Sequence, residues 1–535
     1  MAHIGVDSSR LQEPKQRKWH AMAKKAKKRG ARAFPKGRHP SLDARTQIDD
    51  LLGDVAKGRQ HLIEHLHTLN DQFGALSKDR LAALAQKLGL AQVDVYDTAS
   101  FYAHFEITDE NTNHAPAVRV CQGPACRMAG SAKLLNDLDN AIPAPCQGAC
   151  ETAPSVMIGR SRIAPATAQT LKATSSVPSI SAVDTTPVPH ITPELERAGL
   201  RGMGGAGFPV AQKWKFLADD GRDRVLVVNA DEGEPGTFKD RYLFETEPEK
   251  VLRGMAITAH ALDVRDAFIY LRDEYPHIYD ALHEALPKLD IPNCRVHLRR
   301  GAGAYVCGEE SALLNSLEGK RGQPRDRPPY PAQSGYLGRP TVTHNVETLY
   351  WIADIAERGE QAYADEERPR FYSVSGRVKN PGVYRAPAST TVSQLIEMAG
   401  GMADGQTFTA FLPGGASGGI FPARFAERAM DFGVFEELGG FVGSGALVVL
   451  SDQDDVWDVA RDMMDFFAHE SCGKCTPCRV GTEKMVGLLQ NPHENEDTIR
   501  VLSQTMQDAS ICGLGQAAPN PVLSIFNHFT EEDPS

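Results

Sequence analysis

Residues 201–209 read RGMGGAGFP and hold four glycines in nine positions. These glycines would let the backbone approach a ligand closely, and a following helix start would offer N–H groups to a phosphate. The preceding segment, ITPELERAGL, reads as a helix, whereas the dinucleotide-binding fingerprint follows a strand. No G-x4-G-K-[ST] pattern occurs, which excludes a P-loop. Taken alone, this glycine loop indicates a ligand-binding loop and nothing more specific.

Two acidic segments with glycines follow predicted strands further along the chain. NADEGEPGTFKDR (229–241) follows the apolar run 225–228, and GAGAYVCGEES (301–311) follows another strand. An isolated acidic pair is usually a solvated surface feature. Here the acids stand beside glycine turns at strand ends, where α/β folds bind ligands. The mixture of strands and helices from 191 to about 365 predicts an α/β domain with a binding site.

Four of the ten cysteines form a first group, Cys121-x4-Cys126 followed by Cys146-x3-Cys150. Glycines in both loops allow tight turns whose N–H groups face sulfur, and four thiolates from two loops suit a [2Fe–2S] cluster. Zinc is an alternative, although structural zinc more often uses C-x2-C. Plain thiols are the other alternative.

Four more cysteines form a second group, Cys472, Cys475 and Cys478 in a C-x2-C-x2-C run and Cys512 further on. Three close thiolates plus a remote one are typical of a [4Fe–4S] cluster. Zinc held by the same four sulfurs is the alternative. We expect the two remaining cysteines, Cys294 and Cys307, to be buried small apolar residues.

Composition and charge narrow the class of protein. The 535 residues carry a net charge of −11, but residues 1–40 alone carry +10. We expect this basic arm either to bind an acidic face of a partner protein or to be a solvated tail. Nucleic-acid binding is disfavoured, because the sequence has no helix-turn-helix or zinc-finger pattern. No apolar run reaches the ~20 residues of a transmembrane helix, and the N-terminus lacks a secretory apolar stretch. We therefore expect a cytoplasmic protein that contacts neither nucleic acid nor membrane.

The motifs together resemble one family. The patterns G-x-G-G-A-G-F-P, NADE-x-EPGT-x-KDR, GAG-x-Y-x-CGEE, NVET and ESCG-x-CTPCR resemble those of NADH-binding flavoprotein subunits. That family includes the 51-kDa-type subunit of respiratory complex I, diaphorase subunits of NAD-reducing hydrogenases, and β subunits of NAD-dependent molybdenum or tungsten formate dehydrogenases. VYDTASFYAHF (95–105) and the first cysteine group resemble the complex I 24-kDa-type subunit. PKGRHP, LIEHLH, LRDEYP, LPGGASGGI and LSDQDDV look most like the formate dehydrogenase subunits.

The resemblance implies a multidomain fold with α+β and α/β parts. We expect these units: a basic arm (1–41), a helical bundle (42–110), a thioredoxin-like [2Fe–2S] domain (111–165), a linker (166–190), an α/β FMN/NAD-binding domain (191–370), a β-grasp-like SLBB domain (371–451) and a helical [4Fe–4S] domain (452–535). For the SLBB domain we expect docking and packing rather than chemistry.

The resemblance also implies a set of cofactor-binding residues. FMN would be held by Gly202, Gly204, Lys213, Asn229, Asp231, Glu232, Tyr305, Gly308, Glu309, Asn345 and Thr348. NAD(H) would lie near Gly205, Phe208, Phe216, Glu234, Glu310, Arg327 and Tyr330. Arg327 and Tyr330 stand where the family commonly has Lys and Phe, and an Arg is not equivalent to a Lys. Glu234 should repel the 2′-phosphate of NADP.

The implied activity is electron transfer between a partner and NAD⁺. FMN carries the hydride chemistry, so no catalytic side chain is expected. Electrons would come from formate oxidation in a molybdenum or tungsten α subunit with further iron–sulfur clusters, and a small additional subunit could complete the complex. The alternatives are a hydrogenase diaphorase subunit, a fused NADH-dehydrogenase module of complex I, a flavin-free iron–sulfur relay, and a zinc-bound scaffold.

Overall fold

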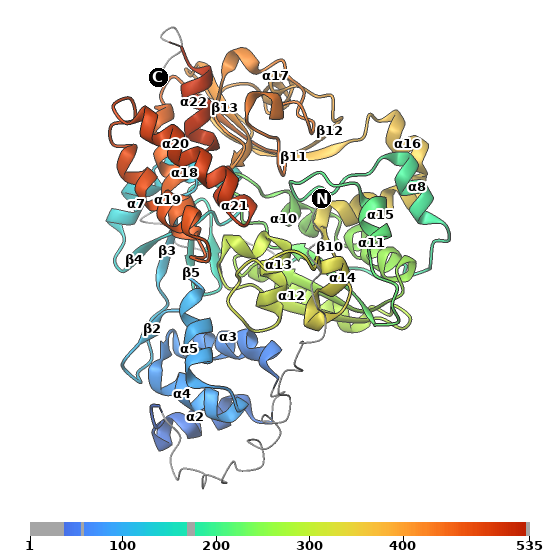
Figure 1. The fold of residues 1–535 in the computed structure, drawn as a ribbon, viewed down its shortest axis with the longest axis vertical. Helices are drawn as coiled ribbons and strands as arrows, with labels where there is room; N and C mark the ends of the chain where they lie inside the picture. Colours follow the sequence, from blue (N-terminus) through green and yellow to red (C-terminus); the bar gives the residue numbers. More distant parts are fainter. Residues whose placement is uncertain (1–36, 55–57, 168–176, 531–535) are drawn as a thin grey trace, which may run out of the picture.

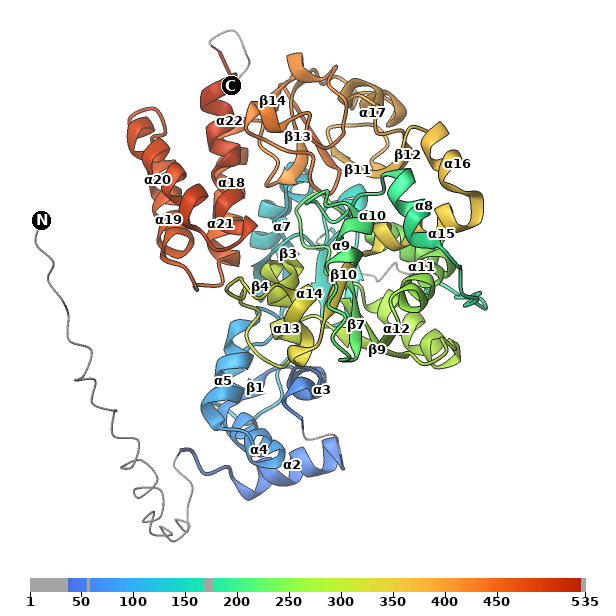
Figure 2. The ribbon, with the colours of Figure 1, turned by 45° about the vertical axis from the view of Figure 1, so that its right-hand side comes forward.

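The computed structural model describes residues 37–54, 58–167 and 177–530. Figures 1 and 2 show the N-terminal helices at one end of the molecule and the C-terminal helices at the other, with the glycine-loop region between them. The expected basic arm lies outside the described residues up to residue 36. Within the part of the chain that is described, no helix is both long and apolar enough to cross a membrane.

Among the described residues, the N-terminal unit contains four α-helices that bury apolar side chains in a common core. They are α2 (Leu42–Leu52), α3 (Leu62–Phe73), α4 (Lys78–Leu88) and α5 (Gln92–Phe101). The Ser77 side chain accepts a hydrogen bond from the Arg80 N–H at the start of α4, and Gly89 ends that helix in the left-handed conformation. A short parallel pair, β1 (Leu76–Ser77) and β2 (Ile107–Thr108), closes the unit.

A small mixed sheet carries the first cysteine group. Its strands are β3 (Val118–Cys121), β4 (Ala141–Ala144), β5 (Val156–Ile158) and β6 (Ser161–Ile163), in the order β4-β3-β5-β6. Helices α6 (Pro124–Met128) and α7 (Ser131–Asp137) connect β3 to β4. Beyond it, residues 177–188 of the expected linker form neither helix nor strand, yet they lie along the central domain, where Ser181 N donates to Glu249 Oε1 over 2.6 Å.

The centre of the molecule is a four-stranded parallel sheet. Its strands are β7 (Arg224–Ala230), β8 (Val264–Leu271), β9 (Arg295–Arg300) and β10 (Thr341–Asn345), in the order β10-β7-β8-β9. The helices around it are α8 (Ile191–Ala198), α9 (Val210–Lys215), α10 (Lys239–Thr246), α11 (Pro248–Ala261), α12 (Pro276–Ala285), α13 (Glu310–Leu317), α14 (Pro331–Ser334), α15 (Val346–Arg358) and α16 (Glu360–Asp365). Because all four strands are parallel, the loops that follow them leave from one edge of the sheet.

Two further units follow the parallel sheet. A five-stranded sheet has the order β12-β11-β15-β13-β14 and contains β11 (Arg370–Gly376), β12 (Gly382–Ala386), β13 (Phe408–Ala416), β14 (Phe421–Pro422) and β15 (Ala446–Ser451), with helix α17 (Val392–Met398) packed on it. The C-terminal helices are α18 (Val456–Glu470), α19 (Thr476–Leu488), α20 (Glu496–Ala509), α21 (Gly513–Ala517) and α22 (Asn520–His528). One buried apolar cluster runs continuously from the N-terminal helices through the parallel sheet to these C-terminal helices.

Candidate functional site

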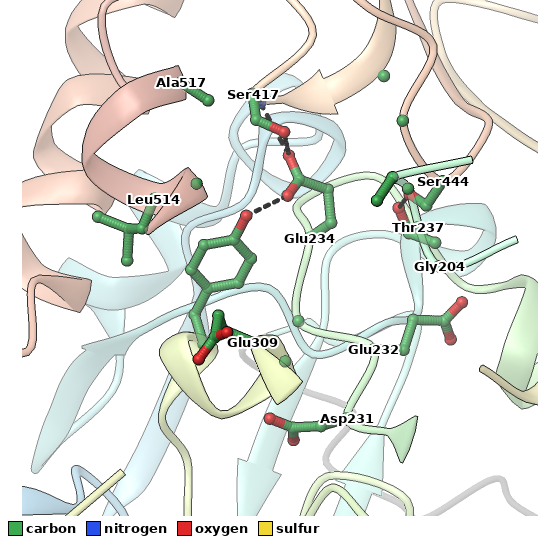
Figure 3. A pocket seen from close by; sticks show the side chains of 18 of the residues that line it. Gly204, Asp231, Glu232, Glu234, Thr237, Glu309, Ser417, Ser444, Leu514 and Ala517 are labelled. Carbon is green, nitrogen blue, oxygen red and sulfur yellow. Dashed lines mark hydrogen bonds between the residues drawn. The ribbon is translucent and has the colours of Figure 1, made fainter. Parts of the chain in front are cut away.

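A cavity of about 470 Å³ opens at the carboxyl edge of the parallel sheet. Its wall takes in the glycine loop, the loop after β7, the 3-10 turn η5 (Tyr305–Gly308) after β9, and Asn345 at the end of β10. The end of β13 and the helix α21 close the opposite side, so three structural units build one site (Figure 3). The position agrees with the expected binding edge of an α/β sheet.

The glycine loop packs directly against the end of β10. A Cβ added at Gly204 would lie 3.2 Å from the Asn345 Cβ, so a side chain there would displace Asn345. The Asn345 side chain caps α15 by accepting from Glu347 N over 3.0 Å, and it donates to Asp240. The loop therefore presents backbone rather than side chains to the cavity.

Two carboxyl groups in the cavity wall have oxygens without a hydrogen-bond partner among the described residues. They are Asp231 Oδ2 and Asp240 Oδ1, and both atoms are buried. Burial raises the pKa of Asp231 to about 8, and burial together with the neighbouring Glu232 raises the pKa of Asp240 to about 8. Both residues line the cavity, and a protonated carboxyl group can donate a hydrogen bond of the kind that suits the hydroxyl and ring-edge groups of a flavin.

Glu232 and Glu234, in contrast, are fully bonded. Glu232 Oε1 accepts from Asp240 N over 2.8 Å, and its Oε2 accepts from Tyr275 OH over 2.9 Å. Glu234 Oε1 accepts from both the N–H and the Oγ–H of Ser417, at 2.8 and 2.9 Å, and its other oxygen accepts from Tyr305 OH (Figure 3). The two acids are thus held in fixed positions on the cavity wall.

A buried ion pair lies in the wall beside Asp240. Lys239 and Glu347 are each 1% exposed and form a direct pair, and Lys239 Nζ also donates to Met203 O over 2.9 Å. The Lys239 ammonium therefore joins α10 to α15 and to the glycine loop. Burial removes both charges of this pair from water, and the hydrogen bonds that the two side chains make are needed to offset that loss of solvation.

The first cysteine group converges at the end of the small sheet. Cys121, Cys126, Cys146 and Cys150 are all buried, and Cys146 Sγ lies 3.5 Å from Cys150 Sγ. Gly123 N points at Cys121 Sγ over 3.5 Å. Four thiols from two loops, with a backbone N–H directed at sulfur, fit an iron–sulfur cluster.

The second cysteine group lines its own small cavity. Cys472, Cys475, Cys478 and Cys512 surround it. Burial raises the pKa of the Cys478 thiol to about 12 and that of Cys512 to about 11. Val306, Cys512 and Leu514 belong to the walls of both this cavity and the large one. The two cavities are therefore separated by single side chains.

Ten of the residues expected to contact FMN or NAD(H) line the large cavity. They are Gly204, Gly205, Asn229, Asp231, Glu232, Glu234, Tyr305, Gly308, Glu309 and Asn345. Gly202 and Thr348 lie behind the wall and support the glycine loop, since Gly202 N donates to Phe208 O and Met203 N donates to Thr348 Oγ1.

The remaining expected residues lie outside the cavity wall. Lys213 Nζ donates to Glu310 Oε2 over 3.0 Å and to Thr343 O over 2.8 Å. Arg327 pairs with Glu309. The three aromatic residues are on the surface: Phe208, Phe216 and Tyr330 are 43%, 52% and 51% exposed. Phe208 and Phe216 have ring centroids 6.3 Å apart.

The structure adds wall residues that sequence reasoning did not select. Lys239 and Asp240 belong to the KDR end of the acidic motif after β7. Others come from distant units: Gly414, Ser417, Phe441, Gly443, Ser444, Gly513, Leu514, Gln516, Ala517 and Asn520. Gly414 and Ser417 belong to the glycine-rich string LPGGASGGI, which is the feature of the sequence that could have indicated them. The 371–451 unit, for which docking and packing are expected, also contributes Ser417 to the cavity wall, where it binds a cavity carboxylate.

Comparison with known families finds matches for four parts of the chain. Residues 195–354 match the Nuo51 FMN-binding domain, and residues 458–533 match the NADH-ubiquinone oxidoreductase-F iron–sulfur binding region. Residues 48–175 match the thioredoxin-like [2Fe-2S] ferredoxin family, and residues 371–421 match the SLBB domain.

Individual relatives agree with these matches. The F-type subunit of the NADH-quinone oxidoreductase of Aquifex aeolicus is 39% identical over 362 residues, which is 63% of this chain and 84% of the relative. The HndC subunit of the NADP-reducing hydrogenase of Solidesulfovibrio fructosivorans is 36% identical over 366 residues, 63% of this chain and 74% of the relative. A crystal structure of an NAD⁺-reducing [NiFe]-hydrogenase superposes with a TM-score of 0.76 at 32% identity, covering 89% of this chain and 94% of that one.

These matches carry FMN-binding, [4Fe–4S]-binding and [2Fe–2S] domains, in keeping with the cavity and the two cysteine groups. The chain belongs to the family of F-type NADH-quinone oxidoreductase subunits, which are NAD-dependent flavin and iron–sulfur oxidoreductases, with a thioredoxin-like [2Fe–2S] domain fused ahead of the flavin domain.

Proposed function

We propose that this chain is the NAD⁺-reducing diaphorase subunit of a cytoplasmic formate dehydrogenase. Its partners would be an α subunit that oxidises formate at molybdenum or tungsten and carries further iron–sulfur clusters, and a small additional subunit. The net reaction would be HCOO⁻ + NAD⁺ → CO₂ + NADH. Support for formate comes from the strings PKGRHP, LIEHLH, LRDEYP and LPGGASGGI, which resemble those subunits.

The observation that carries the diaphorase role is the wall shared by the two cavities. Val306, Cys512 and Leu514 face both the flavin cavity and the second cysteine group. When bound, FMN supplies the exchange between one-electron transfer and two-electron hydride transfer. The three shared residues would exclude water between the two sites and keep them close.

We propose these roles for the residues around the flavin cavity. Gly204, Asn229, Asp231, Glu232, Tyr305, Gly308, Glu309 and Asn345 would contact FMN directly, while Gly202 and Thr348 support the loop. Lys213, bound by Glu310, would help to balance negative charge near the cavity mouth. Asp231, whose pKa is raised to about 8, would hold a proton at neutral pH and donate a hydrogen bond.

NAD(H) selection would rest on Glu234. Its carboxylate is fixed by Ser417 and Tyr305 on the cavity wall, so it cannot swing away from a 2′-phosphate. Gly205 would allow close approach, and the exposed Phe208, Phe216 and Tyr330 rings would offer stacking surfaces outside the cavity. Arg327 lies over the Tyr330 ring. Glu234→Gln is expected to raise the activity with NADPH relative to NADH.

The experiment that separates the partners is elemental analysis of the native complex. The complex containing this chain would be isolated, and molybdenum, tungsten, nickel, iron and FMN quantified. Molybdenum or tungsten with FMN and iron supports the formate dehydrogenase. Absence of both metals from an active complex would overturn it.

A second candidate function is the diaphorase subunit of an NAD⁺-reducing hydrogenase. The TM-score of 0.76 over 89% of this chain favours it, because the match includes the fused N-terminal units. Nickel without molybdenum or tungsten, together with hydrogen-dependent NAD⁺ reduction, would establish this alternative.

A further inference from the structure

A buried arginine connects the first cysteine group to the wall of the flavin cavity. Arg272 follows β8 and is 5% exposed. Its Nη2 donates to the Cys146 carbonyl over 2.6 Å, and its Nη1 donates to the Glu232 carbonyl. Its Nε donates to Glu274 over 3.0 Å. One guanidinium therefore joins a cysteine of the [2Fe–2S] group to an acid of the cavity wall.

Two more side chains make the same connection. Tyr275 OH donates to Glu232 Oε2 over 2.9 Å, and the Tyr275 ring lies so close to Gly148 that a Cβ there would come within 2.1 Å of the hydroxyl. Arg241 donates from Nε to Gly148 O over 2.8 Å, while its backbone N–H donates to Glu232 Oε2 over 3.2 Å. Arg241 also pairs with Glu151.

These contacts leave Glu232 little freedom to move independently of the loop that holds Cys146. Arg272, Tyr275 and Glu232 are all buried, so a lost contact among them would leave a buried polar group without its partner. Residues within one buried hydrogen-bond network respond to each other's substitution. The N–H donors of a guanidinium have a fixed geometry, so Arg272 sets the relative positions of its two carbonyl partners and also places a positive charge beside them.

We propose that Arg272 is a positioning residue that links the [2Fe–2S] site to the flavin site through Glu232. Its charge raises the reduction potential of the cluster, and its two-pronged geometry sets the position of Glu232 and hence FMN affinity. The second effect rests on the proposed flavin site, whereas the first does not.

The expected sign of the potential follows from charge. One-electron reduction adds a negative charge to the cluster, and a buried cation beside it stabilises the reduced form. Replacing Arg272 by a neutral residue therefore lowers the midpoint potential. A tenfold loss in the equilibrium constant for reduction corresponds to about 59 mV for a one-electron couple.

The test uses four variants of the full chain, each with its clusters assembled. The potential of the [2Fe–2S] cluster is measured in flavin-stripped protein by dithionite titration followed by electron paramagnetic resonance. FMN affinity is measured separately, without reductant, by quenching of flavin fluorescence. We expect Arg272→Gln to lower the potential and to weaken FMN binding by about tenfold.

The other variants separate charge from geometry. Arg272→Lys keeps the charge and should preserve the potential while still weakening FMN binding. Tyr275→Phe removes one donor to Glu232 and should weaken FMN binding with little change in potential. Arg160→Gln is the matched control, because Arg160 and Asp280 form an exposed pair, 38% and 52% exposed, between the same two units. It should change neither quantity.

Two outcomes would overturn the proposal. One is an unchanged potential in Arg272→Gln with the cluster intact. The other is unchanged FMN affinity in Arg272→Lys and Tyr275→Phe. If FMN does not bind the wild-type chain at all, the proposed flavin site fails, and the potential still decides the electrostatic role. If Arg272→Gln does not fold, a tenfold loss in the equilibrium constant for reduction in Arg272→Lys would contradict the charge argument.

Discussion

At the scale of single residues, the cavity owes its electrostatic character to carboxyl groups that bind protons at neutral pH. Asp231 Oδ2 and Asp240 Oδ1 are buried and lack hydrogen-bond partners within the described residues, and both groups have a pKa of about 8. A protonated carboxyl donates a hydrogen bond, whereas its ionised form would repel an anionic ligand. We therefore expect these side chains to make ligand binding depend on pH.

We predict that FMN affinity falls as pH rises through about 8, the pKa of Asp231. Where only the protonated form binds, the loss approaches about tenfold per pH unit above the pKa. The same shift means that the folded, flavin-free chain holds a proton that the unfolded chain releases at lower pH, so its stability also decreases as the pH rises toward 8. Flavin fluorescence titrations between pH values of about 7 and 9 measure the first effect, spanning about one unit on each side of the pKa. Asp231→Asn leaves Asp240 as the remaining group with a pKa of about 8 and should therefore make the profile less steep, and an equally steep profile in that variant would contradict the assignment.

A second residue-scale prediction concerns the Lys239–Glu347 pair, each partner 1% exposed. Lys239→Met leaves the Glu347 charge buried without its cation and should reduce the free energy of unfolding by about 3–5 kcal/mol. Urea denaturation of flavin-stripped protein measures this change in the free energy of unfolding. Lys288→Gln, which removes an exposed pair with Glu284, is the control and should leave stability unchanged. Equal stabilities of the two variants would show that the buried pair is dispensable.

At the scale of helices and strands, the close contact between α11 and α15 depends on a glycine. A Cβ at Gly254 would lie 1.9 Å from the Leu349 carbonyl oxygen, so the two helices would have to separate. This packing matters for the site, because Asn345 caps the start of α15 and the helix carries Glu347 and Thr348.

Gly254→Ala should therefore destabilise the chain by about 1–3 kcal/mol, despite the better helix propensity of alanine. Gly487 in α19 provides the comparison, since a Cβ there meets nothing within 4 Å. Gly487→Ala should be neutral or stabilise by up to about 1 kcal/mol. Thermal unfolding of both variants gives the test, and a stabilising Gly254→Ala would mean that α11 and α15 are not packed this closely.

At the scale of the whole molecule, the N-terminal helices are fixed to the parallel sheet by a buried charge network. His104 Nδ1 lies 2.7 Å from Asp273 Oδ2, and Arg300 contacts both Asp273 and Asp71 of α3. Burial would raise the pKa of Asp273, but His104 and Arg300 outweigh burial and hold it well below its ordinary value. The stabilising contribution of Asp273 is therefore present at neutral pH and lost only as the pH falls through that low pKa.

We predict that Asp273→Asn loosens this contact without emptying the flavin cavity. His104 and Arg300 would lose their carboxylate, so hydrogen–deuterium exchange should increase in α3 and around His104 while FMN content stays constant. Asp280→Asn, which removes an exposed pair with Arg160, should leave exchange in α3 unchanged. If hydrogen–deuterium exchange is unaltered in Asp273→Asn, apolar packing rather than the charge network holds the N-terminal helices to the parallel sheet.

The sequence by itself determined the two cysteine groups and much of the local structure, and the resemblance of its motifs to one family indicated the cofactors. Cysteine spacing is a local property, so both groups of four could be identified, and the structure brings each group together. Strands 225–228 and 295–300 and the start of α4 at Ser77 follow from periodicity and capping, which also act over short distances. The acidic loop after β7 could be identified for the same reason, as a turn at the end of an apolar strand.

Only the tertiary structure decided which side chains share the cavity. Ser417 binds Glu234 although the two residues are 183 positions apart in the chain. Leu514, which belongs to a helix near the C-terminus, lies between the two cavities. It also placed Phe208, Phe216 and Tyr330 on the surface rather than in the cavity wall. Such contacts depend on how separate units pack, and packing is a sum of many weak, non-local interactions that no short stretch of sequence encodes.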